Sequence, residues 1–286
     1  MMLNRKELKS KSKEQLRGQW KIPVLITLII SIIQVISNYA VKNFVDNSLI
    51  HILLLILNLL ITLSIGIMVN SFYLKISRDK KVGFSDIFIP WKTFGKGIGI
   101  EVLLGLIIIP IITIIAIIIG VIWALYMSTS IINSLSPSYG ITILLTLILC
   151  IPLIILGLYL FPAVILVCED NNRGVIQCIK ESFKLMKGNL WNLFVLQLSF
   201  IGWVILCITP TIFIAILIVF PLNVLSFVTI VIAFSLHPVA LVILFNIANM
   251  GFLWLVPYMH TTLLNFFNEI SGATNNPMYN EITSLN

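Results

Sequence analysis

The stretch ESFKLMKGNLW, Glu181–Trp191, marks the point where a basic segment gives way to a long apolar one. A shorter version, EQLRGQW, occupies Glu14–Trp20 and also precedes an apolar run. In both stretches a polar run ends at a glycine, Gly18 or Gly188, and a tryptophan follows shortly. The same kind of boundary is therefore used twice, and the apolar segments behind it decide the fold.

The composition places those apolar segments in a membrane. Hydrophobic residues make up 59% of the chain, charged residues only 10%, and the mean hydropathy is +1.09. A soluble domain carries roughly 25% charged residues. The sequence therefore predicts an integral membrane protein with an all-α fold, a polytopic bundle of transmembrane helices.

Run length predicts about six spans, because a bilayer-spanning helix needs about 20 mostly apolar residues. The expected spans are 22–40, 49–74, 98–126, 139–167, 190–220 and 239–267. The further apolar segment 221–238 is shorter and bounded by prolines, which favours a separate interfacial, re-entrant or spanning helix. If it spans, seven helices cross and the C-terminus lies outside. The membrane domain is expected over 1–268 and a disordered polar tail over 269–286.

The first apolar run could be mistaken for a secretory signal, since basic residues precede it. It is long, however, and Asn38 and Ala40 fit a cleavage site poorly. We interpret it as a retained first span.

The cations predict the orientation. All of the 18 Lys and Arg except Lys42 lie before span one, between spans two and three, or between spans four and five. By the positive-inside rule these segments and the N-terminus face the cytoplasm, which predicts a multi-pass protein of the plasma membrane. The net charge of +7 is then explained by the cations that set this membrane orientation. The expected partners are anionic inner-leaflet lipids and a possible membrane protein, with no nucleic acid.

The recurring boundary of a polar run, a glycine and a tryptophan suggests an internal repeat. The repeat would consist of three hairpin units, each preceded by a cytoplasmic interfacial amphipathic helix. The pattern before span five places apolar residues on one helix face (Val175, Ile179, Phe183, Met186) and polar ones on the other (Lys180, Glu181, Lys184, Lys187). It is weaker before span one (Leu8, Ser12, Leu16), and before span three Pro90 interrupts it (Phe84, Ile87, Phe88, Trp91, Phe94). The glycine would allow the turn from lying on the membrane to crossing it.

Basic and aromatic residues at these boundaries are expected to contact lipid headgroups. They are Arg17, Trp20, Lys96, Lys180, Lys184, Lys187 and Trp191. The alternative is that basic-Gly-Trp is common to any cytoplasmic boundary and marks no repeat.

Three blocks resemble a family of bacterial integral membrane proteins of unknown function, mostly from Gram-positive bacteria. They are Gly83–Ile100, Glu181–Trp203 and Phe252–Phe267, and the residues Leu16, Arg17, Gly18 and Trp20 match the family's L-[KR]-G-x-W motif. The apolar stretch Leu206–Met250 is longer than is usual in the family. The family is distantly similar to the membrane domain attached to some glycerophosphodiester phosphodiesterases. The resemblance implies a helical membrane fold and no activity.

No catalytic motif was found, so we expect no enzyme, no cofactor and no metal site. The four cysteines (Cys150, Cys168, Cys178, Cys207) show no ligand spacing and are interpreted as structural. Gly95–Gly99 could cradle a phosphate, although a tight turn with close helix packing is favoured.

Ionisable residues inside spans are the default functional candidates of a membrane protein. Glu101 and His260 qualify and could pair near the cytoplasmic interface. The alternative is that Glu101 reaches the headgroups and His260 bonds a carbonyl near Pro257.

Three function classes follow from these patterns. The first is a non-enzymatic protein that binds anionic lipid and assists or organises other membrane components. The second is a small transporter or permease-like subunit for an apolar or amphiphilic substrate, suggested by mid-span prolines (Pro110, Pro152, Pro210). The third, an intramembrane enzyme, lacks a polar cluster.

Overall fold

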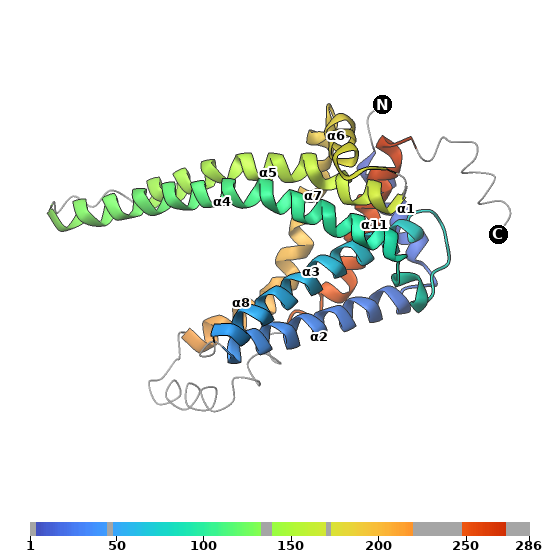
Figure 1. The fold of residues 1–286 in the computed structure, drawn as a ribbon, viewed down its shortest axis with the longest axis horizontal. Helices are drawn as coiled ribbons and strands as arrows, with labels where there is room; N and C mark the ends of the chain where they lie inside the picture. Colours follow the sequence, from blue (N-terminus) through green and yellow to red (C-terminus); the bar gives the residue numbers. More distant parts are fainter. Residues whose placement is uncertain (1–3, 45–47, 133–138, 170–172, 220–247, 273–286) are drawn as a thin grey trace. The chain divides into compact units, whose positions relative to one another are not determined.

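The computed structural model describes residues 4–44, 48–132, 139–169, 173–219 and 248–272 (Figure 1). These residues form helices and the turns between them, and no strand occurs among them. Two compact units divide the chain: unit 1 contains Met1–Phe88 and Asn192–Asn286, and unit 2 contains Ile89–Trp191. The segment 221–238 and most of the expected tail lie outside the described residues.

Unit 1 is built from helices of both ends of the chain. They are α1 (Arg5–Leu16), α2 (Lys21–Asn43), α3 (Ser48–Ile76), the short 3₁₀ helix η1 (Phe84–Ile87), most of α7 (Leu190–Leu198), α8 (Ile201–Val219) and α11 (Phe252–Ile270). Helices α2 and α3 lie side by side (Figure 1), and α11 packs against α1, α2, α3 and α8. The C-terminal helix therefore joins the N-terminal helices into one core.

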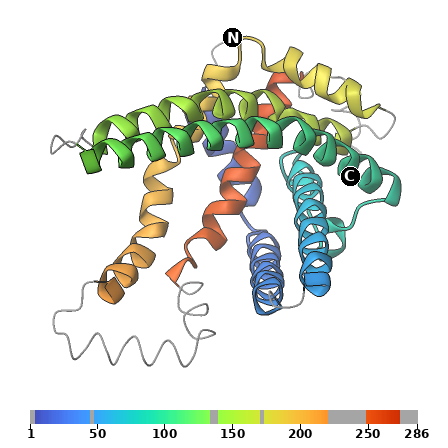
Figure 2. The same cartoon turned by 60° about the vertical axis from the view of Figure 1, so that its left-hand side comes forward.

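Unit 2 is a long helix pair with a short helix on it. Helices α4 (Trp91–Ile132) and α5 (Tyr139–Glu169) run side by side in both Figure 1 and Figure 2, and α6 (Val175–Met186) packs against both. Gly99 lies where α6 meets α4, and a Cβ there would make an ordinary van der Waals contact with Val175 Cγ2, at 3.6 Å. A Cβ on Gly95 would meet no atom within 4 Å, so neither glycine is required for the close helix packing expected of this segment.

Five helical segments among the described residues are long and apolar enough to cross a membrane. They are Lys21–Lys42, Leu49–Ile76, Trp91–Val121, Ile148–Glu169 and Leu190–Ile214. Their exposed leucine, isoleucine and valine side chains would be costly in water and are favourable in lipid. These are the spans of a multi-pass membrane protein. The sixth expected span, 239–267, is not among them; α11 begins at Phe252, and 239–247 lie outside the described residues.

Three boundaries differ from the sequence-based expectation. Span five is two helices, because α7 ends at Leu198 and α8 begins at Ile201. The expected turn at Gly95–Gly97 is wrong: α4 runs through these glycines, so the polar segment from Trp91 and the span form one helix. Helix α11 continues to Ile270, two residues into the expected tail.

The glycines that precede the first and the fifth expected span, Gly18 and Gly188, form turns. Gly18 separates α1 from α2 with φ +85°, and Gly188 separates α6 from α7 with φ +88°. This left-handed conformation strains any residue with a Cβ, which explains glycine at both positions. The prediction of a glycine turn is confirmed here and wrong before α4.

Helices α1 and α6 bury corresponding positions. Helix α1 buries Leu8, Ser12 and Leu16, and α6 buries Cys178, Ser182 and Met186, each pair at the same distance from its turn glycine. The predicted apolar face of α6 is therefore shifted: Phe183 is exposed and stacks on Tyr159, with ring centres 5.0 Å apart. Ser182, next to Phe183, takes a buried position instead and donates from its Oγ to the Tyr159 carbonyl of α5 at 2.6 Å.

Candidate functional site

Helix α1 is fixed to α11 by buried amides. The Asn265 side chain donates to Ser12 Oγ at 2.9 Å and to Gln15 Oε1 at 2.7 Å. Asn265 is 1% exposed, and no donor reaches its Oδ1 among the described residues. Because buried amides lose free energy when unpaired, these bonds fix the position of α1 along α11.

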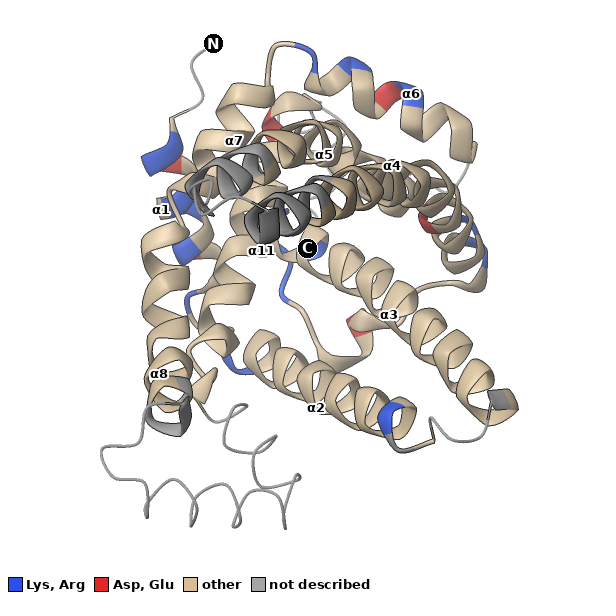
Figure 3. Cartoon of the chain, turned by 90° about the vertical axis from the view of Figure 1, so that its left-hand side faces the viewer, with Lys and Arg blue, Asp and Glu red and all other residues tan. Residues whose placement is uncertain are grey.

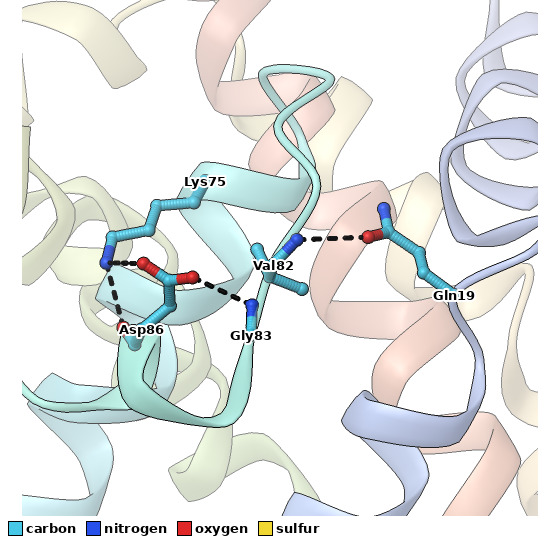
Figure 4. A network of polar contacts seen from close by, with 5 residues as sticks. All are labelled: Gln19, Lys75, Val82, Gly83 and Asp86. Carbon is cyan, nitrogen blue, oxygen red and sulfur yellow. Dashed lines mark hydrogen bonds and ion pairs between the residues drawn. The ribbon is translucent and has the colours of Figure 1, made fainter.

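The same network reaches the end of α3. Gln15 Nε2 donates to the Ser77 carbonyl at 3.0 Å, and Asn268 Nδ2 donates to Ser77 Oγ at 2.9 Å. In Figure 4, Gln19 Oε1 accepts from Val82 N at 3.3 Å, on the loop that leads to η1. Three chain segments that are distant in sequence are thus joined by side-chain amides.

One side of α1 carries three cations at intervals of four residues, Lys9, Lys13 and Arg17, which we name the α1 cation stripe. Lys9 Nζ donates to the Ser199 carbonyl at 2.9 Å, in the break between α7 and α8, and lies 4.1 Å from the centre of the Phe200 ring. Lys13 Nζ lies 5.5 Å from the centre of the Tyr258 ring. The stripe therefore faces aromatic side chains.

The cations of the stripe are not neutralised by ion pairs within the described chain. Among the described residues, none of the three is in an ion pair with a carboxylate. Burial of Lys9, together with Lys13 and Arg5 nearby, lowers the pKa of the Lys9 ammonium. An anion at this place would meet uncompensated positive charge.

Beside the stripe lies a mostly apolar groove of about 540 Å³, which we name the aromatic pocket. Its lining is given by Lys13, Arg17, Trp20, Trp203, Leu206, Cys207, Gly251, Trp254, Leu255 and Tyr258. Trp203 and Trp254 are 55% and 54% exposed, so the groove is open along one side. Its size is that of ordinary ligand pockets, roughly 300–1,000 Å³.

The two ends of the aromatic pocket differ. At one end Tyr258 lies under Lys13 and packs edge-on against Phe200, with ring centres 5.3 Å apart. At the other end Gly251 meets Cys207 so closely that a Cβ on Gly251 would lie 2.8 Å from Cys207 Sγ. Tyr258 stands seven positions after Gly251, about 10 Å along a helix. A cation, Lys13, therefore lies beside Tyr258, and α8 contacts the start of α11 at Gly251.

The basic residues of α6 lie on its exposed side. Lys180, Lys184 and Lys187 are all exposed, as is Trp191 at 70%. Figure 3 shows Lys and Arg on α1 and α6, whereas most of α2, α3, α4 and α5 carries no charge. The headgroup contacts expected of these residues stay a prediction.

Lys96 differs from the other expected headgroup residues. It is only half exposed, and its Nζ donates to the Arg173 carbonyl at 3.1 Å. Arg173 in turn pairs with Glu181 at 3.1 Å and Glu169 at 3.7 Å. Lys96 therefore ties α4 to the loop before α6.

The expected pair Glu101 and His260 is not brought together within one unit. Glu101 lies on α4 in unit 2, and His260 lies on α11 in unit 1, where it stacks on Tyr73 with ring centres 5.2 Å apart. Thr261 Oγ1 bonds the Pro257 carbonyl at 2.8 Å. The pairing stays a prediction.

Sequence reasoning found Arg17 and Trp20 and missed the rest of the aromatic pocket. Trp203 and Trp254 lie in apolar runs without nearby charge, so nothing in the sequence joins them to Lys13. The one usable signal was the four-residue spacing of Lys9, Lys13 and Arg17, which puts the cations on one helix side.

A family model described as Protein of unknown function (DUF975) matches residues 1–274. The chain belongs to this family. The DUF975 match covers both units and both glycine turns. No curated protein and no solved structure matches the chain.

Proposed function

We propose that this protein is a non-enzymatic, multi-pass protein of the plasma membrane that binds anionic lipid and thereby assists or organises other membrane components. Its N-terminus, α1 and α6 face the cytoplasm in this proposal. One observation carries it: α6 presents Lys180, Lys184 and Lys187 on its exposed side, next to the exposed Trp191. A cationic helix that ends at the start of a span lies at headgroup depth.

Charge and aromatic character support lipid as the partner of α6. A cation near an anionic membrane surface contributes about 1 kcal/mol of attraction, so three neighbouring lysines would enrich anionic lipid locally. Ile176 and Phe183 are exposed on the same side and would insert between acyl chains while the lysines reach the phosphates.

The corresponding buried positions and left-handed glycines of α1 and α6 support an internal repeat as the basis of this arrangement. In this proposal each copy lays a short basic helix on the membrane and then turns into a span. The distant similarity to the membrane domain of glycerophosphodiester phosphodiesterases stays a prediction beside it.

The proposal is tested by extracting the protein from native membrane with a lipid-retaining polymer and measuring the co-extracted lipids by mass spectrometry. We expect the anionic fraction to exceed that of the bulk membrane, and to fall toward the bulk value in the variant K180Q/K184Q/K187Q. The control is Lys42→Gln, a change of the lysine at the C-terminal end of α2, far in sequence from α6. An unchanged lipid profile in the triple variant would disprove the role of α6.

The second candidate is a small transporter or permease-like subunit for an apolar or amphiphilic substrate. It is favoured by prolines inside three spans, Pro110 in α4, Pro152 in α5 and Pro210 in α8. Helices with internal proline lose a main-chain hydrogen bond and bend more easily. Flux of fluorescent amphiphiles in reconstituted vesicles, reduced by Pro110→Ala and Pro152→Ala, would favour this candidate; absent flux would count against it.

A further inference from the structure

The aromatic pocket of unit 1 has the form of a site for one molecule. Its lining is mostly apolar and includes two cations, Lys13 and Arg17, one turn apart on the same side of α1. Lys13 stands over Tyr258, while Gly251, at the start of α11, is in close contact with Cys207. A ligand that matches this pattern has one anionic end and an apolar body.

We propose that the aromatic pocket binds one acyl chain of an anionic membrane phospholipid, with the lipid phosphate on Lys13 and Arg17. The inference rests on the proposed function for the class of ligand, an anionic lipid. It assigns that lipid to a built site in unit 1, separate from the surface of α6.

Charge complementarity selects the headgroup. Lys13 and Arg17 are exposed, lie at the same end of the pocket and have no carboxylate partner among the described residues. Arg binds phosphate through two parallel hydrogen bonds, and Lys binds it as a point charge. A zwitterionic headgroup would bring its own cation to the same place and lose part of this attraction.

The lining selects the chain. Trp20, Trp203 and Trp254 come from three different helix starts or turns and meet along one groove. The tryptophan rings offer a large apolar area and have few rotamers. The protein side chains therefore lose little conformational entropy when an acyl chain packs against them. The groove is open along its side, which suits a ligand that enters from the bilayer rather than from water.

The buried amides behind α1 keep the cations over the groove. Asn265 holds Ser12 and Gln15, one turn or less from Lys13 and Arg17 on the same helix. The position of the stripe is therefore set before any lipid binds, which lowers the cost of binding. This separates a built site from a loose basic surface.

The pocket can be observed through its own tryptophans. The chain has six, and changing Trp91, Trp123 and Trp191 to Phe leaves Trp20, Trp203 and Trp254, all of which line the pocket. This variant is placed in phosphatidylcholine nanodiscs that contain small fractions of phosphatidylglycerol brominated on its acyl chains. Brominated phosphatidylcholine at the same fractions is the matched control.

We expect quenching by the anionic lipid to saturate at low mole fraction, and quenching by the zwitterionic lipid to rise only in proportion to its amount. Changing Lys13 and Arg17 to Gln should raise the half-saturating fraction about tenfold for each cation removed, a loss of about 1.4 kcal/mol, because each change removes a charged contact with the phosphate. Leu206→Phe, which fills the groove, should lower the amplitude without a change of charge.

Three results would overturn the proposal. They are equal quenching by both lipids, quenching that never saturates, and release of the brominated lipid by millimolar inorganic phosphate, which would make the site one for a soluble anion. The variant K180Q/K184Q/K187Q separates this inference from the proposed function. It should leave the saturable quenching unchanged while it lowers the co-extracted anionic lipid. Loss of the saturable quenching in this variant would overturn the inference, whereas an unchanged co-extracted lipid would overturn the proposed function.

Discussion

Gly18 and Gly188 share a left-handed backbone, with φ of +85° and +88°, at the junctions of α1 with α2 and of α6 with α7. Around both junctions the main chain bonds in the same way: Gln19 N donates to the Leu16 carbonyl at 3.1 Å, and Asn189 N donates to the Met186 carbonyl at 3.0 Å. The same turn geometry thus leads twice from a short basic helix into an apolar one.

Replacing either glycine by alanine should lower stability through the backbone alone. A Cβ at Gly18 or Gly188 would meet no atom within 4 Å, so the cost is the left-handed conformation, about 1–2 kcal/mol. Thermal unfolding in detergent measures it. Gly202→Ala and Gly157→Ala are matched controls, since these glycines are helical, also have free space, and should be neutral or slightly stabilising. Equal effects at all four positions would contradict the turn role.

Gly251→Ala should force α8 and α11 apart, because the new Cβ would lie 2.8 Å from Cys207 Sγ. Overpacking of this kind costs about 1–3 kcal/mol. Cys207→Ala removes the sulfur and should recover most of the loss in the double variant. Unfolding temperatures of the four proteins of this double-mutant cycle give the coupling. Additive losses would mean that the helices do not meet at this contact.

Asn265→Leu should loosen α1. The change leaves the Ser12 and Gln15 oxygens without their buried donor, and losing such partners costs about 1–3 kcal/mol. We expect faster trypsin cleavage after Lys13 and Arg17 in the folded protein. Thr262→Val is the control, since the buried Thr262 hydroxyl donates to the Tyr258 carbonyl of its own helix and joins no other described helix to α11. Equal cleavage rates in wild type and Asn265→Leu would rule out the amide attachment.

The loop between α3 and η1 should weaken at acidic pH. The Gly83 N–H, at 2.8 Å, and the Lys75 ammonium, at 2.9 Å, lower the pKa of the Asp86 carboxyl (Figure 4). A carboxyl with a lowered folded pKa stabilises the loop above its ordinary value of about 3.9, and this contribution is lost as pH falls through the folded pKa. Carbon NMR of labelled Asp86 measures the titration. A midpoint at or above the ordinary value contradicts the contact, and Asp86→Asn should abolish the pH dependence of the Gly83 amide.

The sequence was most informative where local chemistry decides. Glycine at 18 and 188 predicted turns because few other residues adopt a left-handed backbone. At Gly95 the same reasoning was wrong, since glycine also adopts the helical backbone at a modest cost, and α4 continues through Gly95 and Gly97. The break at Ser199 was missed because its stabilising donor, Lys9, lies far away in the sequence.

By itself, the sequence determined that this protein is a membrane protein. It also determined the starts of the apolar runs and the helix sides that carry the cations, because hydropathy and helical period are local properties. Only the tertiary structure decided that helices from both ends of the described chain share one core and that Lys13 and Arg17 line a groove with three tryptophans. Those relations depend on α11 packing against both α1 and α8, and the packing of distant helices follows from the shapes of many side chains at once.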